Sequence, residues 1–488
     1  MAALAPPRGS SADTRCWPAI VVIALLPLWL LGMFDRQLWT PDEPREADIA
    51  WRMSMQSDWT LPQFAGRPWL EKPPLSYWMA AASQRLFGDS PRAARLPNLL
   101  YALLAALAVG SLGAALAGRR GALVAALVAG SALLAWRVSI WLAPDAALVA
   151  GCAIALLGAY RGYCAPSGSR KLAWYSVMHA GAALGFMAKS APGWLVPGLA
   201  LVGLIIWERR WSELRRPELY AGLVLQLLLV GTWTLRVGLG PDGAHALQVL
   251  FWNNLAGRFV HVRAPAEIDY ALAHKNWIGK YLVELPLYLL PWTLLAVAAV
   301  RRAWTGVRLA GDAGTAWRFA SAASLPFLLL LSVAATARDV YAAPAIPGIA
   351  LLIARWSQDA GERPSVFDLR ALRASRWLVA GVAGIFAGAA ALAARTRGPW
   401  ESMLGIAIAI AALLAAGALL IGAARAARRD ELHASFLWTY AAFVASVSIA
   451  ASALLPAVDR WQDLPSIARA VRADVGGRDL ALLQPDET

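Results

Sequence analysis

Cysteine and histidine are scarce in this sequence of 488 residues, which contains three Cys and five His. Cys16, Cys152 and Cys164 show no paired spacing, so we expect neither a disulfide nor a thiolate metal framework. Charged residues are also few, at 16%, whereas apolar residues reach 59% against roughly 45–50% in soluble domains. The composition therefore excludes an ordinary soluble domain.

The apolar residues lack the alternating pattern of a transmembrane barrel and show no internal repeat of the kind common in transporters. They form blocks of roughly 16–22 residues, long enough to cross a bilayer as helices. We therefore predict an all-α polytopic membrane protein. The first block, 17–34, resembles a signal peptide in length, but no small-residue cleavage site follows it, so we interpret it as an uncleaved helix.

The blocks predict about thirteen transmembrane helices in one domain, 17–455. These helices are expected at 17–34, 97–117, 121–136, 144–163, 172–187, 192–207, 218–237, 282–300, 318–336, 341–355, 376–394, 403–424 and 435–455. Two long loops, 35–96 and 238–281, lie between them, and the first should contain interfacial helices. Residues 1–16 and 456–488 form short ends, and 464–475 has the pattern of an amphipathic helix.

The basic residues alternate between successive short loops. A net charge of +14 would suggest nucleic-acid binding in a soluble protein, but here the Arg residues flank apolar blocks, so we expect membrane lipids and no nucleic acid as partners. Arg-rich loops on one side alternate with loops that hold isolated bases on the other. The positive-inside rule then predicts a cytoplasmic N-terminus, with both long loops and the 456–488 tail on the periplasmic side of a bacterial inner membrane.

Carboxylates cluster in the first long loop. Asp42 and Glu43 stand in "LWTPDEPREADIAWRM", where Arg45 follows, and Asp42 is either a helix N-cap or a functional acid. Glu71 and Lys72 stand in "GRPWLEKPPLSYW", among aromatic residues that indicate burial rather than a surface turn. A buried Glu beside a Lys must be paired or coordinate a ligand.

More polar residues are expected on the same face. Asp145 opens the span at 144–163, as a cap or as a functional acid, since an acid at the edge of an apolar helix carries an insertion cost. Bases and other polar groups follow in later outer loops, where they suit an anionic ligand such as phosphate or reach lipid headgroups. These residues are Lys189, Arg258, His261, Arg338, Asp339 and Tyr341.

Several of these motifs together resemble those of a known family. The Asp-Glu pair, "RPWLEKPPLSYW", "ARLPNLL", "AKSAPGWLVPGLAL" and "ARDVYAAPAIPGIALL" resemble the ArnT-like branch of the GT-C membrane glycosyltransferases, which is related to the protein O-mannosyltransferases. The resemblance covers about residues 17–460. It implies a GT-C bundle and an enzyme that moves a hexosyl or pentosyl unit from a polyprenyl-phosphate donor to lipid A or another envelope glycolipid, with inversion.

The resemblance also assigns roles to the candidate residues. Asp42, Asp145 and Glu71 match catalytic acids, and Glu43, Arg45 and His261 match supporting positions. The residues expected near the donor phosphate are Lys72, Lys189, Arg258, Arg338 and Tyr341. We expect the enzyme to act as a monomer.

The chain departs from the family pattern near a metal position. Some aminoarabinose transferases carry a His shortly before the Arg of the second loop, whereas this chain has Asn253 and Asn254 there, with His261 as a substitute. No cofactor is certain, and a divalent metal at Glu71 stays open at this point. The C-terminal tail is also shorter than in many relatives, which leaves the acceptor open.

Two other function classes stay open beside the glycosyltransferase. A transporter or flippase of carrier-linked sugars should carry charges near mid-membrane and broken helices, and a scaffold of the same fold would not need the acids. A transferase that acts on protein or polysaccharide is the third alternative. The gathering of polar residues on one face favours surface catalysis on a glycolipid.

Overall fold

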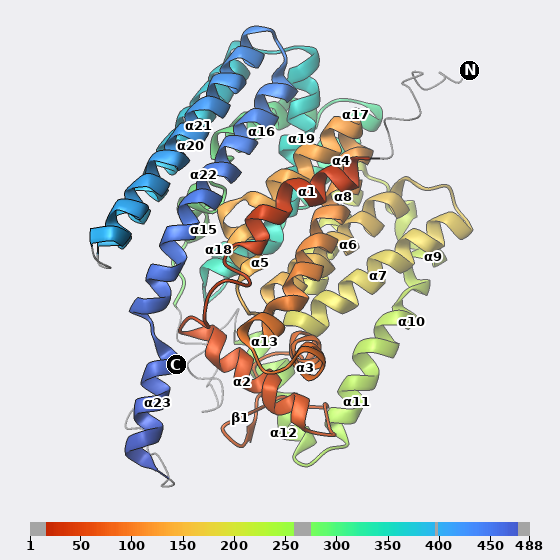
Figure 1. Cartoon of the computed structure of the whole chain (residues 1–488). Helices are drawn as coiled ribbons and strands as arrows, with labels where there is room; N and C mark the ends of the chain where they lie inside the picture. Colours follow the sequence, from red (N-terminus) through yellow and green to blue (C-terminus); the bar gives the residue numbers. More distant parts are fainter. Residues whose placement is uncertain (1–15, 258–274, 396–398, 477–488) are drawn as a thin grey trace.

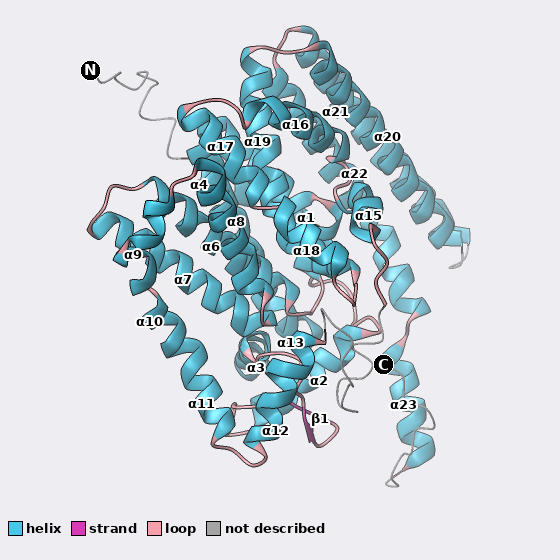
Figure 2. Ribbon diagram, turned by 180° about the vertical axis from the view of Figure 1, so that it is seen from behind, coloured by secondary structure: helices cyan, strands magenta, loops and turns pink. Residues whose placement is uncertain are grey.

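The computed structural model describes residues 16–257, 275–395 and 399–476. It shows an all-helical bundle, with α20, α21 and α22 packed together as a layer along one side (Figure 2). The first half of the chain contributes α1 (Trp17–Leu30), α2 (Asp42–Met55), α3 (Leu75–Phe87), α4 (Pro91–Ser131), α5 (Leu133–Ile140), α6 (Asp145–Cys164), α7 (Ser169–Lys189) and α8 (Pro192–Glu208). The short strands β1 (Gln63–Phe64) and β2 (Arg67–Pro68) form an antiparallel hairpin between α2 and α3.

The middle of the chain contains short helical pieces, of which those from Pro217 to Gly238 run on as one helix. They are η1 (Trp211–Arg215), α9 (Pro217–Ala221), α10 (Leu223–Gln226), η2 (Leu227–Gly231), α11 (Thr232–Gly238), α12 (Gly243–Leu247), η3 (Gln248–Asn253) and α13 (Asn254–Ala256). The remainder consists of α15 (Lys280–Tyr288), α16 (Thr293–Gly306), α17 (Gly311–Ala322), α18 (Leu325–Val333), η4 (Asp339–Ala345), α19 (Ile346–Glu362), α20 (Val366–Arg395), α21 (Pro399–Arg428), α22 (Leu432–Trp461) and α23 (Leu464–Val475).

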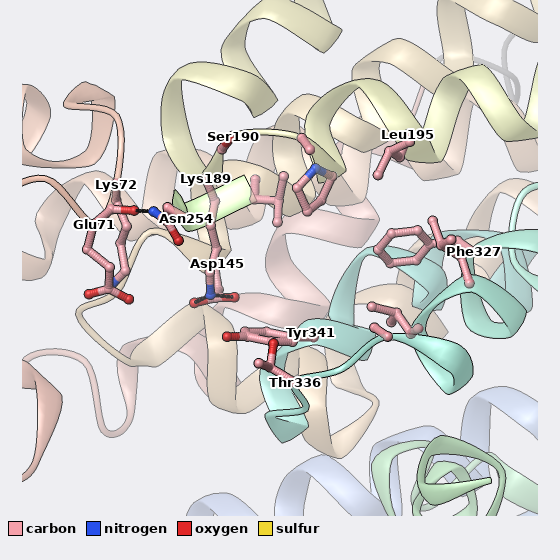
Figure 3. A pocket seen from close by; sticks show the side chains of 16 residues that line it. Glu71, Lys72, Asp145, Lys189, Ser190, Leu195, Asn254, Phe327, Thr336 and Tyr341 are labelled. Atoms are coloured by element: carbon pink, nitrogen blue, oxygen red, sulfur yellow. Dashed lines mark hydrogen bonds and ion pairs between the residues drawn. The ribbon is translucent and has the colours of Figure 1, made fainter. Parts of the chain in front are cut away.

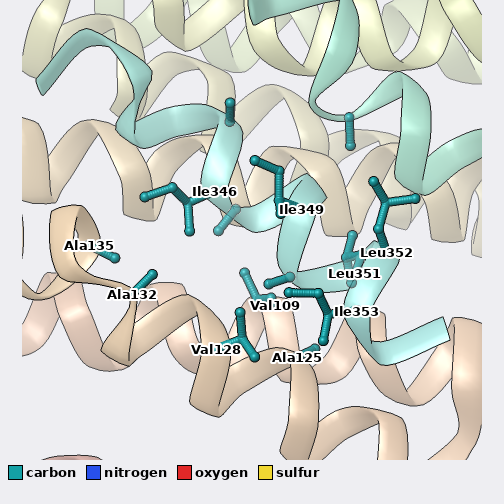
Figure 4. Close-up of a cluster of buried hydrophobic side chains, with 14 of the residues drawn as sticks. Val109, Ala125, Val128, Ala132, Ala135, Ile346, Ile349, Leu351, Leu352 and Ile353 are labelled. Carbon is teal, nitrogen blue, oxygen red and sulfur yellow. The ribbon is translucent and has the colours of Figure 1, made fainter. Parts of the chain in front are cut away.

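Small residues let the helices approach closely. A Cβ on Gly158 of α6 would lie 2.2 Å from the backbone nitrogen of Met178 on α7. Small residues at such contacts allow tight van der Waals packing, which holds membrane helices together where apolar burial gives little advantage over lipid. The core in Figure 4 brings branched residues of α19, such as Ile349 and Ile353, together with Ala125 and Val128 of α4.

The predicted helix at 97–117 and the predicted helix at 121–136 correspond mainly to the two halves of α4. The backbone leaves the helical conformation at Ala117 and Gly118, where Gly118 has φ +66°. A Cβ on Gly113 would lie 2.5 Å from the carbonyl oxygen of Gly121, so the two halves pack against each other as a hairpin. Glycine adopts a positive φ without a steric penalty, which allows the reversal.

Eight helices in the described residues are long and apolar enough to cross a membrane. They are Pro91–Ser131, Asp145–Cys164, Pro217–Gly238, Gly311–Val333, Asp339–Glu362, Val366–Arg395, Trp400–Arg428 and Leu432–Val475, with Trp17–Leu30 and Pro192–Glu208 as shorter apolar helices. The count of thirteen is not confirmed. The predicted span at 282–300, for example, is divided into α15 and α16 around Pro291, since proline cannot donate the helical hydrogen bond.

The predicted helices outside the spans are present. The pattern "PREADIAWRMSMQ" lies in α2, and the amphipathic tail segment forms α23. In Figure 1, α2, α3 and β1 lie together at one end of the bundle, opposite the turn between α21 and α22. We call α2, α3 and the β1–β2 hairpin the first-loop layer. This layer packs against the end of the bundle where α6 begins and α7 ends.

Candidate active site

A polar cavity lies between the first-loop layer and the end of the bundle. It has a volume of about 540 Å³, part of it open to solvent, and charged residues from six segments line it. These residues are Asp42, Glu71, Lys72, Arg137, Asp145, Lys189, Arg338 and Asp339, together with Tyr341. The structure therefore brings together residues that are nearly 300 positions apart in the chain.

Asp42 begins α2 and faces two guanidinium groups. Its carboxylate accepts a hydrogen bond of 2.7 Å from Arg45 and one of 3.3 Å from Arg338. Burial raises the pKa of Asp42, but the positive charges of Arg338 and Lys72 outweigh burial, so the pKa lies below its ordinary value. The N-cap interpretation is wrong, because Pro41 occupies the cap position and no side chain caps the helix. Asp42 is thus held ionised at the cavity wall.

Lys72 is buried between two carboxylates. Its Nζ lies 3.0 Å from Glu46 and 3.6 Å from Glu71. Burial lowers the pKa of Lys72, but the two carboxylates outweigh burial and raise the pKa above its ordinary value, so the ammonium group is stably charged. Burial and pairing of the Glu-Lys motif are confirmed. Glu46 is a partner that the sequence did not reveal, since it looks like any polar residue of an amphipathic helix.

Asp145 and Lys189 form a second ion pair in the cavity. The Nζ of Lys189 donates to both carboxylate oxygens, at 2.6 and 2.8 Å, and lies 5.2 Å from the ring centroid of Tyr341. Figure 3 shows Asp145 and Lys189 pointing toward each other beside Tyr341. The cap interpretation of Asp145 is wrong as well, because Pro144 takes the cap position and no side chain caps α6.

An apolar cavity continues from the charged one. It encloses about 800 Å³, part of it open to solvent, and shares Glu71, Lys72, Asp145, Lys189 and Tyr341 with the polar cavity. Its other end is lined by Leu148, Leu195, Phe327, Leu330, Leu331 and Ala334. Figure 3 shows the charged groups at one end and Leu195 and Phe327 at the other. The combined space suits a molecule with an anionic head and an apolar chain.

Glu43 lies behind the cavity wall rather than in it. Its carboxylate is fully buried and accepts hydrogen bonds from Arg36 at 2.9 Å, Arg95 at 2.7 Å and the backbone nitrogen of Leu142 at 2.9 Å. Burial raises the pKa of Glu43, but the two guanidinium groups outweigh burial and lower the pKa below its ordinary value. Glu43 therefore joins the first loop to α4 and to the segment before α6.

Two predicted site residues, Arg258 and His261, lie outside the described residues. The described part of the chain contains no group of three or more His, Cys, Asp or Glu side chains that could hold a metal. Among the described residues, the Glu71 carboxylate lies 3.6 Å from the Lys72 ammonium. Its backbone oxygen accepts a hydrogen bond from Asn254 of α13.

Comparisons with known proteins agree with this architecture. A family model described as dolichyl-phosphate-mannose-protein mannosyltransferase matches residues 71–235. The undecaprenyl phosphate-alpha-4-amino-4-deoxy-L-arabinose arabinosyl transferase of Edwardsiella ictaluri is 31% identical over 346 residues, which cover 70% of this chain and 59% of the relative. The transferase of the same name from Aeromonas salmonicida is 30% identical over 403 residues, covering 81% of this chain and 70% of the relative.

A solved structure shares the fold. The crystal structure of ArnT from Cupriavidus metallidurans bound to undecaprenyl phosphate aligns with a TM-score of 0.71 and 22% identity, covering 95% of this chain and 81% of that one. The aligned part spans 59–62% of the length of the three curated relatives matched first. With its helices long and apolar enough for several passes, the chain is a multi-pass membrane protein. It belongs to the ArnT-like family of GT-C membrane glycosyltransferases.

Proposed function

We propose that this protein transfers a sugar from a polyprenyl-phosphate-linked donor to lipid A or another envelope glycolipid. The observation that carries the proposal is the joined cavity, which is charged at one end and apolar at the other. An isoprenoid phosphate likewise has a charged phosphate at one end and an apolar chain at the other. Relatives named as undecaprenyl phosphate-linked arabinosyl transferases, and the ArnT structure bound to undecaprenyl phosphate, support this choice of donor.

The donor would lie with its phosphate at the junction of the two cavities. Lys72, Lys189 and Tyr341 line both cavities, and Arg338 lines the polar one. Preorganised cations at this point stabilise the charge that builds on the leaving phosphate. The prenyl chain would follow the apolar residues, such as Leu195 and Phe327. We assign Arg258 to the same phosphate and His261 to a supporting position, as the family motif suggests.

Asp42 would act on the acceptor. Its ionised carboxylate takes the acceptor proton, or orients an acceptor that is already ionised, while the acceptor oxygen attacks the anomeric carbon. The bond from that carbon to the phosphate oxygen breaks, and polyprenyl phosphate leaves with the electron pair. One displacement inverts the anomeric configuration. Asp145 and Glu71 hold the cations Lys189 and Lys72 in place, and Arg45 orients Asp42.

The reaction would take place at the periplasmic face of the bacterial inner membrane, in a monomer whose catalytic domain is 17–455. The Arg-rich stretch 425–429 leads into the turn between α21 and α22, at the end of the bundle away from α2 and α3 (Figure 1). The positive-inside rule then puts that turn and the N-terminus in the cytoplasm, and the cavity and the 456–488 tail outside.

Reconstitution tests the proposal. The purified protein in vesicles receives undecaprenyl-phosphate-linked aminoarabinose with lipid A, with a protein acceptor or with a polysaccharide acceptor. We expect release of undecaprenyl phosphate and a matching mass gain on lipid A. A mass gain only on protein or polysaccharide would change the acceptor, and no release with any acceptor would contradict transfer from this donor.

Lys72→Ala should weaken use of the donor by on the order of a hundredfold in kcat/KM, because one preorganised cation at the phosphate is lost. The check is the dependence of initial rate on donor concentration, together with thermal unfolding, since Glu46 and Glu71 lose their partner. Lys72→Arg keeps the charge and serves as the control. If the rate of Lys72→Ala depended on donor concentration as in the wild type, Lys72 would not bind the donor phosphate.

Arg338→Gln should shift the acidic limb of the pH–rate profile upward, by about one pH unit or less in a partly open site. The guanidinium of Arg338 lowers the pKa of Asp42, so its removal raises that pKa and protonates Asp42 at a higher pH. Arg137→Gln is the matched control, because Arg137 lines the same cavity but pairs with Asp339. If the acidic limb of the profile does not move in Arg338→Gln, then that limb does not report the titration of Asp42.

A further inference from the structure

The C-terminal end of α22 contacts the segment that leads into Asp42, more than 400 residues earlier in the chain. The Oδ1 atom of Asp459 accepts hydrogen bonds from the backbone nitrogen of Gln37 at 3.0 Å and from Nε1 of Trp39 at 2.6 Å. Close beyond it, at the first residue after α22, the Oε1 atom of Gln462 accepts one from the backbone nitrogen of Thr40 at 2.9 Å. Two side chains about one helical turn apart thus bind residues 37, 39 and 40.

The same short segment is held on its other side by Glu43. The backbone nitrogen of Trp39 donates to Glu43 at 2.9 Å, and the Arg36 guanidinium, which is bonded to Glu43, lies 4.3 Å from the Trp39 ring centroid. These contacts of Trp39 belong to the buried ion-pair cluster of Arg36, Glu43 and Arg95. The contacts to Asp459 and Gln462 are polar and partly open to solvent, and they come from a different part of the chain.

Asp42 follows this segment directly and is the first residue of α2. A shift of residues 37–40 therefore moves the start of α2 and turns the Asp42 carboxylate relative to Arg338. Misplacement of a reacting group by about 1 Å costs on the order of a hundredfold in rate. The segment must accordingly be fixed on both sides for Asp42 to face the acceptor.

We propose that Asp459 and Gln462 are positioning residues for Asp42, and that the end of α22 is part of the catalytic apparatus. The inference rests on the proposed function and deepens it. Neither residue lines the charged cavity or the apolar one. Their effect passes through residues 37–40.

Kinetics of three variants and one control variant test the positioning role. In Asp459→Ala and in Gln462→Ala we expect kcat to fall by roughly tenfold to a hundredfold. The KM for the donor should change much less than kcat, because Lys72 and Lys189 also pair with Glu71 and Asp145, which lie outside this segment. Asp459→Asn should retain most of the activity, since both hydrogen bonds end on Oδ1 and an amide oxygen can accept them. Asp463→Ala removes a nearby acid that caps α23 through Ser466, and it serves as the matched control.

Hydrogen–deuterium exchange of peptides that cover residues 37–46 gives a second readout that needs no catalysis. Exchange should rise in Asp459→Ala and stay at the wild-type level in Asp459→Asn and Asp463→Ala. Wild-type kcat and wild-type exchange in Asp459→Ala would overturn the inference. The inference would also be overturned if Asp459→Asn lost as much kcat as Asp459→Ala and both variants lost thermal stability. An inactive wild type would contradict the proposed function, while the exchange would still decide whether α22 holds the segment.

Discussion

Asp42→Asn is expected to abolish sugar transfer, with a fall in rate of about a hundredfold or more, while the protein still inserts into the membrane. The amide has the size of the carboxylate, and its oxygen can still accept from Arg45 or Arg338. It cannot take a proton from the acceptor, and general-base contributions are typically about 10²–10⁴-fold. The expected loss is therefore one of chemistry and not of folding.

The measurement is the initial rate of purified Asp42→Asn, together with its yield in the membrane fraction and its elution as a single species. Asp48→Asn is the matched control, because Asp48 lies on the same helix and forms an exposed pair with Arg52. That control should keep full activity. Full activity in Asp42→Asn would show that another group handles the acceptor proton.

Glu43→Ala is expected to lower the free energy of unfolding by about 3–5 kcal/mol, the usual result when one partner of a buried ion pair is removed. The change leaves Arg36 and Arg95 buried without their carboxylate. It also frees the segment before Asp42, so activity should fall along with stability. Thermal unfolding in detergent measures the effect as a drop in Tm.

Two comparisons make the Glu43 result specific. Asp48→Ala on the exposed side of α2 should leave Tm unchanged, because surface pairs contribute little. The pKa of Glu43 is lowered in the folded state, so its stabilisation is present above about pH 4.3 and is lost as the pH falls through the folded pKa. Glu43→Gln should therefore lose less Tm on acidification than the wild type. A Glu43→Ala protein with wild-type Tm would contradict the structural role.

Much of the site could be predicted because acids and bases stand out in an apolar chain. Asp42, Asp145, Lys72 and Lys189 each follow or begin an apolar stretch, where an uncompensated charge is costly. The motif resemblance then pointed to one outer site, and the structure brings these residues into one cavity. Their catalytic roles stay predictions until the variants are measured.

The partners of these residues could not be predicted. Glu46, Arg36 and Arg95 look like ordinary polar positions, and the bond between Arg95 and Glu43 joins residues 52 positions apart. Sequence spacing gives no information on such pairs. The cap interpretations of Asp42 and Asp145 were wrong because each helix begins one residue earlier than the pattern suggested, with Pro41 and Pro144 at the cap positions.

Local backbone geometry limited how well the number of membrane helices could be predicted from the sequence. Hydropathy separates the predicted helices 97–117 and 121–136 close to Gly118, where α4 reverses, but it does not show that Pro291 separates α15 from α16. A missing backbone donor acts at a single residue, whereas hydropathy averages over a whole span. The order of the helices could therefore be predicted more closely than their ends.

The most direct test of the central claim is mass spectrometry of envelope lipids from cells with the gene, without it, and with only the Asp42→Asn variant. We predict a sugar-sized mass on lipid A or another envelope glycolipid that is present with the wild-type gene and absent in the other two. Identical lipids in all three, with no change in the pool of carrier-linked sugar, would contradict the account.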